Sequence, residues 1–282
     1  MTKVMKIGEK QYPRLLSEIS DPPETLYYSG NPDVLERPCL ALVGSRKCTK
    51  YGEVVAKRIA GRAAENGITV VSGMAMGIDS AAHIGCLEAG GKTVAVLGCG
   101  LDICYPPSNR RLMDRIRKNG LLLSEYEEGV SPRPYHFPQR NRIISGICES
   151  TVVVEAARGS GSLITAELAA AQGRNVYSVP GYITSGHSFG ANMLIRDGAV
   201  PLIVIDDLIS DMGVSLKSDD KIKVKLGKDE RIVYDFLVAV GETTVDRICE
   251  ESMMSPEKVN SIVTILEIKG LVDGSMGKIF IV

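Results

Sequence analysis

Long apolar runs and paired cysteines are both missing from this sequence. No stretch approaches the ~20 apolar residues of a membrane-spanning helix, and the first residues carry no apolar signal segment. The seven cysteines are scattered without a Cys-x-x-Cys pair, which is typical of reduced thiols inside cells. Three histidines, far apart in the sequence, are too few for a metal site. We therefore expect a cytoplasmic protein with no membrane segment, no metal and no cofactor.

A strong charge of either sign is missing too. The chain carries a net charge of −1, which excludes a protein that holds nucleic acid through its overall charge. The distribution is uneven, because residues 228–282 hold six Lys and Arg against ten Asp and Glu. Any nucleic-acid binding must therefore come from a local cluster of cations.

What the sequence does have is a set of five apolar segments that each continue into a glycine-bearing loop, at residues 39–46, 69–73, 93–100, 152–161 and 176–181. Apolar runs without alternation are typical of strands that are buried on both faces of a parallel sheet. A glycine at the end of such a strand lets the backbone approach a ligand, and the next helix offers free N–H groups to an anion. The pattern predicts an anion-binding edge along the sheet.

Composition divides the chain into four segments. Residues 1–36 are punctuated by prolines and are predicted to pack on the main domain, which is a Rossmann-like α/β domain over 37–212. Residues 213–227 are predicted to be a linker. Residues 228–282 read as three helices followed by a hairpin, which is the order of a winged helix. Helices are predicted over residues 52–66, 78–89, 108–119, 139–149, 161–172, 188–197, 206–211, 229–240, 243–252 and 255–269.

Cations gather in the loops of the predicted sheet edge. They are Arg46, Lys47, Lys50, Arg110, Arg111, Arg140, Arg142 and Arg158. The aromatic rings interleaved with them are Tyr105, Tyr135, His136 and Phe137. Cations together with stacking platforms favour a site for single-stranded nucleic acid over one for a duplex groove. The alternative is that the arginines are structural and pair with Asp102, Glu125 or Glu155.

Catalytic motifs find little support. The stretch from Cys86 to Thr93 misses the phosphate-binding pattern of nucleotide triphosphatases and precedes a strand instead of following one. Asp79 and His83 are open to two interpretations, a helix cap with a buried histidine or a pair of ligands for a sugar or base. No nucleophile and base stand at a convincing spacing, so we expect no enzyme activity.

Several motifs occur together in an order that resembles one protein family. They are Val43-Gly44-Ser45-Arg46, Ser72–Asp79 with His83, Gly98–Asp102 with Tyr105-Pro106, Phe137–Arg142, Ser160–Ser162 with Thr165, Val179–Gly181 and Gly190–Ala199. Over residues 12–205 the chain resembles the DprA/Smf (DNA-processing protein A) family. The resemblance implies an extended Rossmann-like fold that binds single-stranded DNA, protects it and helps to load the RecA recombinase, in natural transformation or recombination. It also implies a homodimer formed around Met193–Ile205.

The resemblance carries its binding residues onto this chain one by one. Arg46 is expected to be the main phosphate ligand, followed by Arg140 and Arg142, while Arg110 lies where members often carry a basic residue. Four glycines are expected to matter because the DNA comes close to the backbone there, namely Gly73, Gly77, Gly159 and Gly161. The full set of DNA-binding residues expected here is Gly44, Ser45, Arg46, Lys47, Gly73, Gly77, Arg110, Phe137, Arg140, Asn141, Arg142, Gly159 and Gly161.

Two other functions stay open at this point. A nucleoside-monophosphate phosphoribohydrolase has a similar sheet, although the stretch Gly159–Glu167 has the wrong spacing for the motif of such enzymes and no preceding proline. A winged-helix regulator with a ligand-sensing domain is the second alternative. The acidic segment 228–282 is a poor reader of duplex DNA, because its charge repels phosphates. We expect it to regulate the protein or to contact another protein.

Overall fold

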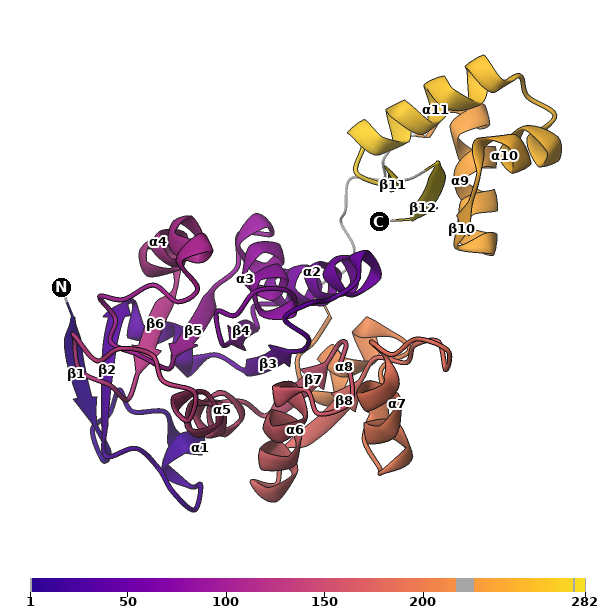
Figure 1. Cartoon of the computed structure of the whole chain (residues 1–282). Helices are drawn as coiled ribbons and strands as arrows, with labels where there is room; N and C mark the ends of the chain where they lie inside the picture. Colours follow the sequence, from indigo (N-terminus) through magenta and orange to yellow (C-terminus); the bar gives the residue numbers. More distant parts are fainter. Residues whose placement is uncertain (1, 217–225, 276, 282) are drawn as a thin grey trace. The chain divides into compact units, whose positions relative to one another are not determined.

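A computed structural model describes residues 2–216, 226–275 and 277–281 of the chain. The chain divides into a main unit, Met1–Lys217, and a C-terminal unit, Ser218–Val282 (Figure 1). Most of the linker predicted over residues 213–227 lies outside the described residues.

The described part of the main unit has a nine-stranded sheet in the order β1-β2-β6-β5-β4-β3-β7-β8-β9. The seven strands β3 to β9 run parallel to one another. At one edge, β2 pairs antiparallel with β6, and β1 pairs antiparallel with β2. This confirms the predicted α/β fold with a mostly parallel sheet. The strands are β1 (Lys3–Lys6), β2 (Thr25–Gly30), β3 (Cys39–Val43), β4 (Thr69–Ser72), β5 (Thr93–Leu97), β6 (Leu121–Ser124), β7 (Ser150–Val153), β8 (Asn175–Ser178) and β9 (Val200–Pro201).

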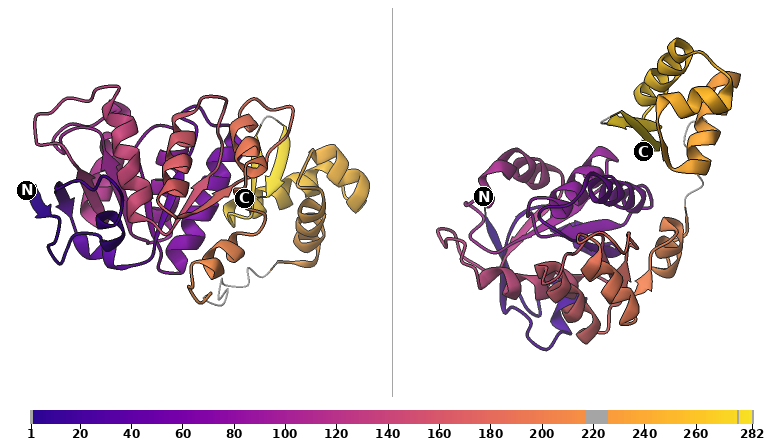
Figure 2. Two further views of the ribbon diagram at one scale, coloured as in Figure 1. Left: turned by 90° about the horizontal axis from the view of Figure 1, so that it is seen from below. Right: turned by 45° about the vertical axis from the view of Figure 1, so that its right-hand side comes forward.

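Helices cover both faces of this sheet, which is why its central strands are apolar along their whole length. One layer is formed by α2 (Lys50–Glu65), α3 (Ile78–Glu88), α4 (Arg110–Asn119) and α8 (Ile205–Asp211). The other layer is formed by α1 (Arg14–Ser17), α5 (His136–Ile147), α6 (Gly161–Ala171) and α7 (Phe189–Arg196). Figure 1 and the right-hand view of Figure 2 show the sheet between these layers.

The N-terminal segment does more than pack on the main domain. Its strand β2 pairs antiparallel with β6, and β1 pairs with β2, so the segment extends the sheet itself. Its helix α1 buries Leu16 against α5 on one face of the sheet. The segment is therefore part of the fold that carries the site.

All ten predicted helices are present, with their ends displaced by at most three residues. The largest displacement is at α5, which begins at His136, three residues before the predicted start. Pro138 does not prevent this early start, because the first turn of a helix needs no N–H donor there. Arg140 and Arg142 consequently lie beyond the first turn of α5, whereas a helix over residues 139–149 would hold both in its first turn.

The described part of the C-terminal unit consists of three helices and a three-stranded antiparallel sheet in the order β10-β12-β11. Its core is formed by Val233, Leu237, Val259, Leu266 and Ile279. This is the predicted element order, and the identification as a winged helix stays a prediction. The elements are α9 (Lys228–Val240), β10 (Glu242–Thr243), α10 (Val245–Ser252), α11 (Pro256–Ile268), β11 (Val272–Ser275) and β12 (Lys278–Ile281).

The search for membrane and metal features covers the described ranges. Within them, every helix is too short or too polar to cross a membrane. Over the same residues, histidine, cysteine and acidic side chains do not gather in a group that could hold a metal ion.

Candidate functional site

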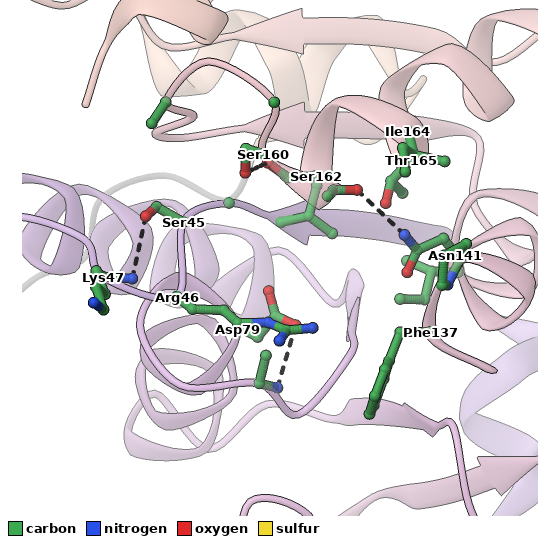
Figure 3. A pocket seen from close by; sticks show the side chains of 18 of the residues that line it. Ser45, Arg46, Lys47, Asp79, Phe137, Asn141, Ser160, Ser162, Ile164 and Thr165 are labelled. Atoms are coloured by element: carbon green, nitrogen blue, oxygen red, sulfur yellow. Dashed lines mark hydrogen bonds between the residues drawn. The ribbon is translucent and has the colours of Figure 1, made fainter. Parts of the chain in front are cut away.

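A pocket of about 760 Å³ opens at the carboxyl ends of the parallel strands (Figure 3). Its walls come from the loop after β3 and the loop after β7, which are neighbours in the sheet. In the sheet, β3 has β4, the next strand along the chain, on one side and β7 on the other. Ligands of open α/β sheets bind at such a point, because the two loops diverge and leave a crevice.

A buried carboxylate holds the first wall in place. The Glu155 Oε2 atom accepts a hydrogen bond from the Thr49 backbone N–H at 2.8 Å, and Oε1 accepts one from the Thr49 hydroxyl at 2.5 Å. The Ser45 backbone N–H donates to the Glu155 carbonyl oxygen at 2.7 Å. A side chain at Gly52 would meet the same carboxylate, with the added Cβ only 2.5 Å from it. Glu155 therefore fixes the β3–α2 loop and is not the arginine partner that the structural alternative proposed.

Arg46 extends from this loop toward α5 (Figure 3). Its Cζ atom lies 5.3 Å from the ring centroid of Phe137, which is a cation–π arrangement. Arg46 and its neighbour Lys47 are exposed, and neither forms a salt bridge within the described residues. Two cations without a carboxylate partner at the mouth of a pocket are available to an anion.

Arg140 also lines the pocket, but its guanidinium is committed to the protein. Nη1 donates to the carbonyl oxygen of Gly73 at 2.6 Å and to that of Val96, and the residue is 4% exposed. Burial lowers the pKa of Arg140 to about 10, although the nearby charge of Asp79 opposes the shift. This side chain joins the ends of β4 and β5, so Arg140 has a structural role at the pocket, and its role as a phosphate ligand stays a prediction.

Arg142 and Arg110 lie outside the pocket lining. Arg142 Nη2 binds both oxygens of Glu125, at 2.7 and 2.9 Å, and its Nε binds Asp21 at 3.0 Å. This is the ion pair that the structural alternative named, and the role of Arg142 as a phosphate ligand stays a prediction. Arg110 is exposed at the start of α4, with its Nε 3.8 Å from Asp114.

The four glycines expected to approach DNA fall into two groups. A Cβ at Gly73 would lie 2.5 Å from the Arg140 guanidinium, and a Cβ at Gly77 would lie 2.3 Å from the Ser45 carbonyl oxygen. These two glycines therefore allow parts of the protein to approach one another, and their approach to DNA stays a prediction. Gly159 and Gly161 line the pocket and have open space on the side where a Cβ would stand.

Two of the four predicted stacking rings line the pocket. Tyr105 and Phe137 have ring centroids 5.4 Å apart, and Tyr105 is 43% exposed. His136 is buried, stacked on Tyr126 at 4.0 Å, with Nδ1 3.0 Å from the Gly98 carbonyl oxygen. His136 is therefore a packing residue and not a platform for bases.

The second wall is rich in hydroxyl groups at the start of α6, opposite Arg46 (Figure 3). Ser160 and Ser162 have their Oγ atoms 2.8 Å apart, and Thr165 follows one turn later. The Asn141 side-chain amide donates to the Gly161 carbonyl oxygen at 3.3 Å, which joins α5 to this wall. These hydroxyls are missing from the set predicted from the sequence, although the run Arg158–Glu167 does read as a donor-rich helix start.

The structure shows His83 as a buried histidine, as the first interpretation expected, but Asp79 does not cap the helix, because the N-cap of α3 is Gly77. Asp79 is buried and accepts hydrogen bonds from the Gly73 and Ala75 backbone N–H groups, at 3.2 and 3.3 Å. Burial raises the pKa of its carboxyl group, and Arg140 opposes this. His83 is fully buried, with Nδ1 2.7 Å from the Thr93 hydroxyl, and burial lowers its pKa to about 3. His83 is thus a neutral core residue, and Asp79 shapes the pocket floor through its backbone contacts.

Of the predicted residues, nine line the pocket, namely Gly44, Ser45, Arg46, Lys47, Phe137, Arg140, Asn141, Gly159 and Gly161. The arrangement brings exposed cations, aromatic rings, hydroxyls and a helix start to one crevice. An anion with flat, apolar groups attached fits this chemistry.

Comparisons with known proteins agree with this description. Residues 3–213 match the family model described as DNA recombination-mediator protein A. The chain is 50% identical over 188 residues to the DNA processing protein DprA of Streptococcus pneumoniae, which covers 67% of this chain and 66% of that protein. It is 42% identical over 209 residues to protein Smf of Synechocystis, covering 73% and 52%. The chain thus spans about half to two thirds of the length of these curated relatives.

Solved structures show the same likeness. The X-ray structure of DNA processing protein A from S. pneumoniae has a TM-score of 0.72 and 46% identity, and the match covers 74% of each chain. The DNA processing protein A of Helicobacter pylori, for which a single-stranded DNA binding mode is described, has a TM-score of 0.69 and 29% identity, covering 75% of this chain and 95% of that one. Sequence, fold and pocket together place this chain in the DNA recombination-mediator protein A family, the DprA/Smf family of DNA-processing proteins.

Proposed function

We propose that the pocket binds a short segment of single-stranded DNA without turning it over. The observation that carries the proposal is Arg46, an exposed cation without a carboxylate partner among the described residues, held 5.3 Å above the Phe137 ring. The cation attracts a phosphate, and the rings of Phe137 and Tyr105 offer surfaces to the bases on either side.

The opposite wall supports the same ligand. Arg158 is exposed, with its Cζ 4.5 Å from the ring centroid of Phe189, and it precedes the start of α6. A helix of this length directs free N–H groups and a positive dipole toward an anion. Cations on both walls and aromatic rings in the lining suit a flexible single strand. We expect little base specificity and a strong dependence of affinity on salt, because phosphate contacts dominate.

The state of Asp79, the acidic group in the pocket lining, supports binding without turnover. Both backbone hydrogen bonds to Asp79 end on Oδ2, and its burial disfavours the charged form that a general base needs. The rival enzyme, a phosphoribohydrolase, predicts release of free base from nucleoside monophosphates. Incubation with the four monophosphates and chromatography of the products distinguishes the two functions.

A homodimer would place two such pockets on one strand and raise the affinity through effective concentration. The face around Met193–Ile205 supports this part of the proposal, because Val200, Ile203 and Val204 are exposed apolar residues in and after the edge strand β9. We expect Ile203→Glu to convert a dimer into a monomer, as measured by light scattering during size-exclusion chromatography. An unchanged mass would contradict the assignment of this face.

In recombination, the bound strand would be protected and handed to the RecA recombinase. This step predicts that the protein speeds the formation of RecA filaments on DNA that is already covered by a single-strand binding protein. Fluorescence of a labelled strand follows filament growth with time. Equal growth rates with and without the protein would contradict this step and leave the binding proposal intact.

The test of the pocket is fluorescence anisotropy with a labelled single strand and its duplex. We expect the single strand to bind more tightly, and Arg46→Ala to weaken it by at least about tenfold, which is ~1.4 kcal/mol. The matched control is Arg58→Ala, since Arg58 is an exposed arginine of α2 outside the pocket lining. Equal binding by both variants would overturn the proposal.

A further inference from the structure

Helix α4 carries a high positive charge, although the chain as a whole is nearly neutral. Its ten residues contain five cations against the one acid Asp114, a net charge of +4 in a chain of net charge −1. The apolar residues Leu112, Met113 and Ile116 are buried against the sheet, so the polar residues occupy the outward face.

Three of the cations form a stripe along that outward face. Arg111, Arg115 and Lys118 are spaced four and three residues apart, which places them on one side of a helix. All three are exposed, and none forms a salt bridge among the described residues. Asp114 does not neutralise the stripe, because it lies between Arg110 and Arg117, at 3.8 and 3.3 Å. We call these three residues the α4 stripe.

On a helix face that is only solvated, we expect cations to be paired with acids. Helix α2, in the same layer, pairs Lys50 and Lys57 with Glu53, at 3.7 and 2.8 Å, and Arg62 with Asp206 at 2.6 Å. The first turn of α4 contains no acid and instead begins with Arg110 and Arg111. Cations at this end oppose the helix dipole and cost some stability unless an anion is present.

The start of α4 is fixed beside the pocket. Tyr105 lines the pocket, and the short 3₁₀ turn Pro107–Asn109 leads from it directly into α4. The Asn109 side chain donates to the Met74 carbonyl oxygen at 2.8 Å and to the Ser80 hydroxyl at 2.9 Å, which anchors this corner to the β4–α3 loop. From there α4 runs beside β5 and β6 on the same face as α3 (Figure 1).

We propose that the α4 stripe binds the phosphates of the same single strand after it leaves the pocket over Tyr105. This proposal rests on the proposed function of the pocket. The stripe is about 10 Å long at 1.5 Å per residue, so it fits two or three successive phosphates. The pocket would then hold the bases at one point, while the stripe sets the direction in which the backbone continues.

The experiment compares two triple variants that each lose three positive charges. One is Arg111→Gln/Arg115→Gln/Lys118→Gln, and the control is Lys10→Gln/Arg37→Gln/Arg58→Gln, whose three cations are exposed, without a salt bridge among the described residues and outside the pocket lining. Anisotropy is measured with labelled strands of about 6 and about 20 nucleotides, since single-strand site sizes of ~4–16 nucleotides are usual. Thermal unfolding shows that both variants are folded.

We expect the stripe variant to bind the short strand within about twofold of the wild type and the long strand at least about tenfold more weakly. Its slope of log affinity against log salt for the long strand should fall by about 2, from ~0.7 for each of three lost contacts. The control variant should match the wild type on both strands.

Long-strand binding by the stripe variant that equals the control overturns the proposal, and an acidic protein then becomes the partner to test. Failure of the wild type to bind either strand overturns the pocket's proposed function and the stripe proposal with it. Loss of the short strand in Arg46→Ala, with the stripe variant unaffected on both strands, overturns the stripe proposal alone.

Discussion

The Arg140 Nη1 atom donates a hydrogen bond to the Gly73 carbonyl oxygen across 2.6 Å, and in doing so it fills the space that any side chain at position 73 would need. The same atom binds the carbonyl oxygen of Val96, so one buried cation joins two strand ends at the floor of the pocket. Arg140 shapes the floor of the pocket, whereas Arg46 lies at its mouth.

Replacement of Arg140 should therefore destabilise the main unit. Arg140→Met leaves two buried carbonyl oxygens without this donor and removes the positive charge beside the buried Asp79. We expect the free energy of unfolding to fall by about 3–5 kcal/mol, as measured by urea denaturation. The double variant with Asp79→Asn should lose less than the two single losses combined. A fully stable Arg140→Met would contradict this role.

Arg142, two residues further along the same helix, offers a contrast. Arg142→Gln breaks a bidentate ion pair with Glu125, and we expect a loss of about 1–3 kcal/mol of stability. Affinity for a single strand should stay within about twofold of the wild type, because this guanidinium lies outside the pocket. Denaturation and anisotropy on one preparation separate the two effects. A tenfold loss of affinity in a stable variant would contradict this prediction and indicate that Arg142 binds DNA.

The burial of His83 leads us to expect that stability depends on pH. Burial lowers its pKa from 6.5 to about 3, so between these values the unfolded chain binds a proton that the folded chain does not. The free energy of unfolding should therefore fall as the pH falls below 6.5, by up to about 1.4 kcal/mol per pH unit from this group. His83→Gln should remove this contribution. Urea denaturation at pH ~7 and ~5 compares the two proteins, and equal pH dependence would exclude the mechanism.

The C-terminal unit should contribute little to the affinity for DNA. Its residues 228–282 carry ten acids against six cations, and the pocket and the α4 stripe both belong to the main unit. A chain that ends at Lys217 should bind a single strand within about threefold of the full chain, ~0.7 kcal/mol. Anisotropy under identical salt tests this. A loss of tenfold or more would assign the unit a direct contact with DNA.

The sequence predicts most of the sheet and helices because their apolar patterns are local. Strands such as β3 are apolar without interruption, and only a position between two helix layers accepts that pattern. The four-residue strand β6 went unassigned because it follows a helix directly at Gly120 and has no glycine loop after it. Strands β1 and β2 mix polar and apolar residues among prolines, and their pairing depends on β6.

The site is predicted only in part, because a motif does not say which way a side chain turns. Arg46, Arg140 and Arg142 look alike in the sequence, yet of these three only Arg46 is an exposed residue of the pocket lining, since Arg140 is buried and Arg142 lies outside it. The partners that engage Arg142 lie 17 and 121 residues away in the sequence. Contacts over such distances are set by the folded sheet and leave no local signal.

The hydrogen bonds of Glu155 have a mechanical consequence. They join the loop after β3 to the end of β7, so the two walls of the pocket are linked where they begin. We expect walls linked in this way to resist parting, which would free a strand all at once. A bound strand should instead leave lengthwise, one nucleotide after another, from whichever end a competitor first pulls. Release would then have a direction, and an incoming protein could follow the strand as it is peeled away.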